Sequence, residues 1–146
     1  MLFQSGDRIV ENTEHMFNVL AYHIRRHPRV RLLISTYMCF IPSGISFVEN
    51  FISTLKENGT SVRMLVGLDR YGTTSSIDKV MTDSRRICPC AVFVPDMHMK
   101  AFVFSDDWCV FGGRNMSVSR STDLTVFAHS TEIADYVRRE TGKYGV

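Results

Sequence analysis

A buried strand, an amphipathic helix and a second buried strand follow one another in the first half of the chain. Residues 29–40 (RVRLLISTYMCF) are rich in branched and aromatic side chains, as strands buried on both faces are. Residues 45–57 carry apolar side chains at helical spacing, and residues 62–68 form the next apolar run. Two strands joined by a helix pair in parallel through a right-handed crossover. The sequence therefore predicts an α/β fold.

The rest of the chain supplies further elements around this unit. Gly and Pro clusters and shifts in apolar period separate them. The expected elements are a helix over 12–26, a short helix over 75–82, a strand over 88–94 near a sheet edge, strands over 98–104 and 108–111, a last strand over 123–128 and a final helix over 131–140. We expect a single domain over 1–146, with a lead-in over 1–11, a core over 12–140 and a tail over 141–146.

Composition excludes some classes of protein. The chain has 146 residues, is 45% hydrophobic and has a net charge of +2, which by itself does not indicate a polyanionic partner. No long apolar run follows a basic start, so we expect neither a signal peptide nor a membrane span, and a reduced cytoplasmic location. The four cysteines lack zinc-finger spacing, and Cys88-Pro89-Cys90 is too tight for an easy disulfide. We therefore expect buried thiols and no metal site.

The stretch from residue 98 to 115 (HMKAFVFSDDWCVFGGRN) has the pattern of a hairpin that carries polar side chains. Alternation places His98 and Lys100 on one face of the first strand. A two-residue turn at Asp106-Asp107 would make residues whose numbers sum to 213 face each other. In that register Lys100 lies opposite Gly113, and His98 lies opposite Asn115.

Those groups suit phosphoryl chemistry. Lysine and asparagine hold non-bridging oxygens, while a histidine attacks phosphorus or carries the proton. The glycines leave room for a substrate beside the backbone. No metal or other cofactor is required when the cations are protein side chains.

His98-x-Lys100 followed by Gly-Gly-x-Asn-x-Ser at 112–117 resembles the HxK(x)4D(x)6GSxN signature of the phospholipase D superfamily. From about residue 12 to 140 the succession is similar to one repeat of that fold, most of all to its small Nuc-type bacterial endonucleases. The resemblance implies a mixed, mostly parallel sheet flanked by helices. Two positions depart from the signature: Gly113 stands at the serine, and Ser105 stands at the aspartate. Either Ser105 or the next residue, Asp106, is expected to do the work of that aspartate.

The resemblance also implies a role for each matching residue. His98 would be the nucleophile that forms a phosphohistidine, Lys100 and Asn115 would hold phosphoryl oxygens, and Asp123 would orient His98. Around them, the residues expected to contact substrate are Gly113, Arg114, Ser117 and Arg120. The other histidines have no lysine and asparagine in register with them. We expect surface or half-buried positions for His15, His23, His27 and His129.

Family members form one active site from two such sets, in which one histidine attacks and the other protonates the leaving oxygen. This chain carries one set, so the resemblance implies a homodimer. The expected activity is metal-independent cleavage of nucleic acid, with DNA favoured over RNA and no stable membrane association. Two alternatives stay open: a phospholipid phosphodiesterase or transferase, and a nucleic-acid-binding module whose catalysis has decayed.

Overall fold

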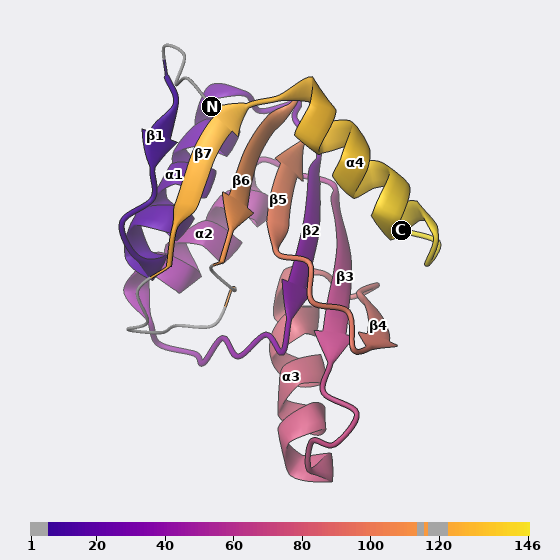
Figure 1. Cartoon of the computed structure of the whole chain (residues 1–146). Helices are drawn as coiled ribbons and strands as arrows, with labels where there is room; N and C mark the ends of the chain where they lie inside the picture. The colour runs from indigo at the N-terminus through magenta and orange to yellow at the C-terminus, as the bar shows by residue number, and fades with distance from the viewer. Residues whose placement is uncertain (1–5, 114–115, 117–122) are drawn as a thin grey trace.

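The computed structural model describes residues 6–113, 116 and 123–146. One seven-stranded sheet runs through the molecule in the order β1-β7-β6-β5-β2-β3-β4 (Figure 1). Three helices contribute to the large core on one face, and α4 packs against the other face. The elements are β1 (Arg8–Ile9), α1 (Thr13–Arg26), β2 (Leu32–Tyr37), α2 (Ser46–Glu57), β3 (Val62–Leu68), α3 (Thr74–Ile87), β4 (Val92–Pro95), β5 (Ala101–Phe104), β6 (Trp108–Gly112), β7 (Thr125–His129) and α4 (Thr131–Gly142).

The sheet is mixed, as expected, but it is not mostly parallel. The pairs β2–β3 and β3–β4 are parallel, which confirms the predicted strand–helix–strand unit. The other four pairs, from β1 to β7 and from β7 through β6 and β5 to β2, are antiparallel. The prediction of a mostly parallel sheet is wrong because the described connections from β4 to β5 and from β5 to β6 contain no helix, and a parallel pair needs a helical crossover.

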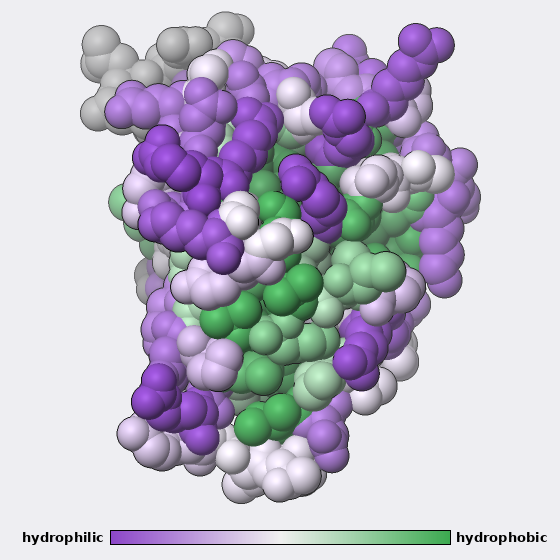
Figure 2. All heavy atoms as spheres, turned by 90° about the vertical axis from the view of Figure 1, so that its right-hand side faces the viewer, coloured by the Kyte–Doolittle hydropathy of each residue, from purple (hydrophilic) through white to green (hydrophobic). Residues whose placement is uncertain are grey.

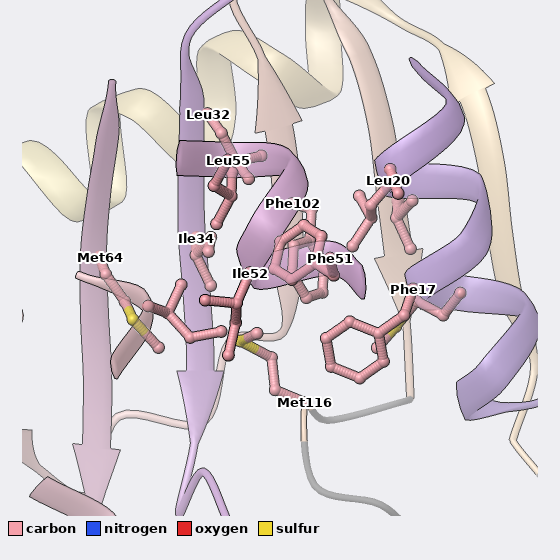
Figure 3. Close-up of a cluster of buried hydrophobic side chains, with 14 of the residues drawn as sticks. Phe17, Leu20, Leu32, Ile34, Phe51, Ile52, Leu55, Met64, Phe102 and Met116 are labelled. Carbon is pink, nitrogen blue, oxygen red and sulfur yellow. The ribbon is translucent and has the colours of Figure 1, made fainter. Parts of the chain in front are cut away.

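The large hydrophobic core lies between helices α1 and α2 and the face of the sheet that these helices cover (Figure 3). Asn12 caps α1 by accepting a hydrogen bond from the backbone N of His15 at 2.8 Å. Phe17 of α1 and Phe51 of α2 are fully buried, with ring centroids 5.3 Å apart. Burial of each such side chain contributes roughly 1.5–3 kcal/mol. This packing holds the two helices against β2 and β5.

Helix α3 is longer than the sequence pattern indicates. The prediction of a short helix over 75–82 is wrong, because the helix runs on to Ile87. Thr73 caps it, and the buried Asp83 accepts a hydrogen bond from the backbone N of Ile41 at 2.9 Å. Val80 and Ile87 are its buried apolar side chains, and so sparse a stripe gives a weak helical signal.

Strand β4 lies at the edge of the sheet, as predicted for a strand next to Pro89. The strand proper begins only at Val92, after the turn that contains this proline. Seen from the β4 side, the molecule shows an area of apolar side chains with hydrophilic borders (Figure 2). None of the helices in the described part of the chain is long and apolar enough to cross a membrane.

The β5–β6 hairpin has a longer loop than the sequence suggested. Ala101 pairs with Phe111 and Val103 with Cys109, so facing residues have numbers that sum to 212. The loop is therefore Ser105–Asp107, and Asp107 takes the left-handed conformation at φ 69°. The two-residue turn is wrong because Asp107 tolerates a positive φ and completes a three-residue loop. Extended by one residue, this register places Lys100 opposite Gly112 instead of Gly113.

Candidate active site

Strand ends gather the predicted site residues at one edge of the sheet. The ends of β2, β3 and β6 and the starts of β5 and β7 all lie at the lower edge in Figure 1. His98 and Lys100 lie in the segment that leads from β4 into β5, Gly113 directly follows β6, and Asp123 shortly precedes β7. The structure thus brings these four predicted residues to a common edge.

His98 is exposed at this edge, and its imidazole ring stacks on the ring of Tyr37. The ring centroids lie 4.1 Å apart with an interplanar angle of 28°. Tyr37 is the last residue of β2 and is half-buried. Desolvation, with the negative charges of Asp69 and Asp96, raises the pKa of the Tyr37 phenol. At neutral pH a neutral aromatic ring therefore supports one face of the imidazole.

The backbone before His98 is held by close contacts to β2 and β3. A Cβ on Gly67 of β3 would lie only 1.7 Å from the carbonyl O of Met97, so only glycine admits this approach. Ser35 of β2 donates a hydrogen bond from Oγ to the carbonyl O of Met99 at 2.8 Å. These contacts flank His98 on both sides in the chain and fix the point from which its side chain projects.

Lys100 is half-buried and lies two residues after His98, directly before β5. Only Met99, whose carbonyl O is held by Ser35, separates Lys100 from His98 along the chain. A partly buried lysine next to an exposed histidine can hold an anion that the histidine contacts.

Gly113 and Asp123 form the other part of the edge. The backbone N of Gly113 donates to the carbonyl O of Leu124 at 3.1 Å, and Gly112 before it has φ 138°. A Cβ on Gly113 would lie 2.8 Å from Oδ1 of Asp123, so the carboxylate fills the space that a side chain would need. In this chain, a serine side chain at position 113 would therefore collide with Asp123, whereas glycine leaves room for that carboxylate.

Four of the predicted residues lie outside the described part of the chain: Arg114, Asn115, Ser117 and Arg120. Met116, between them, is described. Its side chain is fully buried among the residues of the large core (Figure 3), and its backbone N donates to Oγ1 of Thr36 at 3.3 Å. The chain after β6 is thus anchored beside the end of β2, next to Tyr37.

Comparison with known proteins gives fold relatives only. No family model and no curated protein sequence matches this chain. Among solved structures, NucT from Helicobacter pylori is 14% identical, with a TM-score of 0.59 over 97% of this chain and 95% of that one. Phosphatidylserine synthase from Haemophilus influenzae Rd KW20 is 16% identical, with a TM-score of 0.60 over 95% of this chain. This chain covers 36% of that synthase, about a third of its length.

The chain has a phospholipase D-like fold. A third solved structure, TrmBL2, has a TM-score of 0.54 at 9% identity, over 97% of this chain and 54% of that one. TrmBL2 is an archaeal chromatin protein with a novel mode of DNA binding.

Within this phospholipase D-like chain, neither candidate for the signature aspartate reaches the His98 edge. Ser105 and Asp106 lie at the far end of β5 from His98. Ser105 Oγ accepts a hydrogen bond from the backbone N of Arg31 at 2.9 Å, and Asp106 Oδ2 lies 2.9 Å from Nε2 of His23. Neither residue therefore contacts His98, and the expectation that one of them does the structural work of the signature aspartate stays a prediction.

The expectation that His23 is a surface or half-buried residue is wrong, since this residue is only 6% exposed. Its position three residues after the buried Leu20 follows the apolar stripe of α1, a signal that was present in the sequence. Burial lowers the pKa of His23, and the Asp106 carboxylate partly opposes that effect. Tyr37 and Gly67 also contribute to the site, although the sequence analysis did not identify them. Neither belongs to a sequence motif, and only its position near the end of a strand could have indicated it.

Proposed function

We propose that this phospholipase D-like chain is a metal-independent phosphodiesterase that cleaves nucleic acid, DNA in preference to RNA. The observation that carries the proposal is the exposed His98, held against Tyr37 at the sheet edge with Lys100 two residues away. NucT, whose fold this chain shares over nearly the whole length of both proteins, supports a nucleic-acid substrate.

In the proposed reaction a ring nitrogen of His98 attacks phosphorus, and the bond from phosphorus to the leaving oxygen breaks. The leaving oxygen takes a proton from His98 of the partner subunit. Water then attacks the phosphohistidine and gives its proton to that partner imidazole, which restores both rings. Lys100 and Asn115 hold the non-bridging oxygens, and Asp123 orients an imidazole.

A second copy of the chain completes the site in this proposal. The His98 edge carries large exposed side chains: Leu124, next to Asp123, is 72% exposed, and Tyr71, in the loop after β3, is 88% exposed. An apolar side chain that far out of the core is a ready contact for a partner. We assign Leu124 to the interface with the second copy, because it lies beside Asp123 at the edge where the partner's His98 would enter.

Phospholipid cleavage or transfer is the second candidate. The fold likeness to phosphatidylserine synthase and the exposed Leu124 beside the site favour it. An apolar side chain at a catalytic edge can contact a lipid as well as a protein.

Cleavage of plasmid, single-stranded DNA and RNA in excess EDTA tests the proposal, with His98→Ala as the variant. We expect cleavage that survives EDTA and disappears in His98→Ala. Retained cleavage in that variant would overturn the role of His98. Phospholipid hydrolysis without nucleic-acid cleavage would select the second candidate. Nucleic-acid binding without any product, in both proteins, would select a binding module instead.

A further inference from the structure

His23 is a buried imidazole at the opposite end of the sheet from His98, and the proposed reaction does not use it. It projects from α1 into an aromatic environment, with ring centroids 4.4 Å from Phe104 and 5.8 Å from Phe127. Its Nε2 lies 2.9 Å from Oδ2 of Asp106, in the loop of the β5–β6 hairpin. A hollow of about 300 Å³, lined in part by His23 and Trp108, opens beside it.

A second histidine lies one helical turn further along. His27 caps the end of α1 four residues after His23, and the two rings have centroids 4.4 Å apart. His27 and Asp106 are exposed, whereas His23 is buried. Ligand atoms from these three side chains all lie within 4.8 Å of one another. Two elements far apart in the sequence, α1 and the hairpin loop, thus direct two ring nitrogens and one carboxylate oxygen toward a common point.

We propose that His23, His27 and Asp106 bind one divalent transition metal ion of the Zn²⁺ type. Imidazole nitrogens with a carboxylate suit Zn²⁺, whereas Ca²⁺ and Mg²⁺ prefer oxygen ligands alone. With bonds of roughly 2.0–2.1 Å, tetrahedral ligand atoms lie about 3.3 Å apart. The pair His23 and Asp106, at 2.9 Å, is already near that spacing.

Small side-chain rotations complete the site. His27 and Asp106 are exposed and can close on the ion, while the aromatic packing holds His23 still. The ion takes the place of the proton between His23 Nε2 and Asp106, and that proton moves to Nδ1 of the same ring, so that a neutral imidazole offers its Nε2 lone pair to the ion. The fourth position faces solvent, next to Arg26, which lines the same hollow as His27. That positive charge opposes the cation, so we expect weaker binding than at a three-ligand site without a neighbouring cation.

The consequence is structural. The ion would tie the end of α1 to the β5–β6 hairpin, whose first strand leads back to Lys100 and His98. It takes no part in the proposed reaction, which is consistent with activity in EDTA.

Zn²⁺ titration of the full chain by calorimetry, with Co²⁺ absorption as a second probe, tests this site without any activity readout. We expect one equivalent of Zn²⁺ and the visible bands of four- or five-coordinate Co²⁺. The variants His27→Ala and Asp106→Asn should each lower the affinity at least about ten-fold. His27 is exposed, so its variant should keep the far-ultraviolet dichroism of the parent protein.

Matched controls separate this site from adventitious binding. His15→Ala, Cys90→Ser and His98→Ala each remove a potential ligand elsewhere, and we expect Zn²⁺ affinity to stay within about two-fold in all three. Absence of a stoichiometric site in the parent protein would overturn the proposal, as would an affinity that falls with Cys90 or His98 instead of His27. Because binding is expected to survive His98→Ala, this result is independent of the proposed nuclease activity.

Discussion

The imidazole of His98 lies stacked on the phenol ring of Tyr37, with their centroids 4.1 Å apart. The contact joins the end of β2 to the segment that enters β5. No motif in the sequence relates residue 37 to residue 98, so the stacking is a property of the assembled sheet edge. It determines how the proposed nucleophile is presented to a substrate.

Removal of the Tyr37 ring should lower activity. Aromatic stacking contributes about 0.5–1.5 kcal/mol, so we expect kcat/KM of Tyr37→Ala to fall about ten-fold or less, whereas Tyr37→Phe stays within about two-fold. The measurement is nucleic-acid cleavage together with the NMR shift of the His98 ring protons. Unchanged ring shifts and unchanged kcat/KM in Tyr37→Ala would show that the stacking has no role.

Alanine at Gly67 should destabilise the fold. Its Cβ would lie 1.7 Å from the carbonyl O of Met97, and relief requires movement of the backbone before His98. We expect a loss of about 3 kcal/mol or more in the free energy of unfolding, at the upper end of the range for overpacking. Urea denaturation measures it.

Gly142→Ala is the matched control. No atom lies within 4 Å of the Cβ added there, and the residue ends α4, so we expect no loss and a gain of up to about 1 kcal/mol. Equal stability of the Gly67 and Gly142 variants would contradict the close approach of Met97 to β3.

Much of the fold followed from sequence periodicity. The buried stripes of α1 and α2 and the bounds of β3 agree with the pattern because burial imposes the period. The hairpin register did not follow, since two adjacent aspartates are compatible with a two-residue or a three-residue loop. The strand pairing of the folded chain and the left-handed conformation of Asp107 distinguish them.

The candidate site was predicted only in part, for a similar reason. His98, Lys100, Gly113 and Asp123 meet at one edge because strand order brings their elements together. The partner of Asp106 was not predictable, because nothing in local sequence relates residue 106 to residue 23. Contacts between residues so far apart in the chain depend on the packing of α1 over the end of β5.

Asp107 should make the stability of the protein dependent on pH in the acid range. Its carboxylate accepts hydrogen bonds from Arg138 at 2.8 Å and from Thr131 at 2.9 Å, and the Arg138 hydrogen bond lowers the pKa of Asp107 below its ordinary value of 3.8. A carboxyl whose pKa is lower in the folded state contributes stability above its unfolded pKa. That contribution is lost as the pH falls through the folded value.

We therefore expect Asp107→Asn to reduce the free energy of unfolding by about 1 kcal/mol at neutral pH. The difference from the parent protein should stay constant above about pH 5 and shrink below pH 4. Urea denaturation across pH measures it. Asp135→Asn is the control, because Asp135 is 62% exposed in its pair with Arg138 and should contribute little. A difference that persists unchanged at low pH would contradict the assignment to this carboxylate.

Leu124 should be needed for pairing of two copies. A glutamate there would place a charge in the proposed interface, and the loss of one buried leucine is worth about ten-fold or more in the dimer dissociation constant. Light scattering after size exclusion measures the mass across a dilution series. Tyr22→Glu, at a 53% exposed position on α1, is the control and should leave the dimer intact. A parent protein that stays monomeric while fully active would overturn the two-chain site.

The central claim is that two copies of His98 form one metal-independent phosphodiesterase site. Its most direct test is to refold parent protein with increasing amounts of His98→Ala and to measure cleavage in EDTA at constant total protein. If one site needs both histidines, activity follows the square of the parent fraction, so about one quarter remains at equal amounts. A matched mixture with His15→Ala should lose nothing. A linear fall, with about one half remaining at equal amounts, would show that each chain acts alone and would contradict the account.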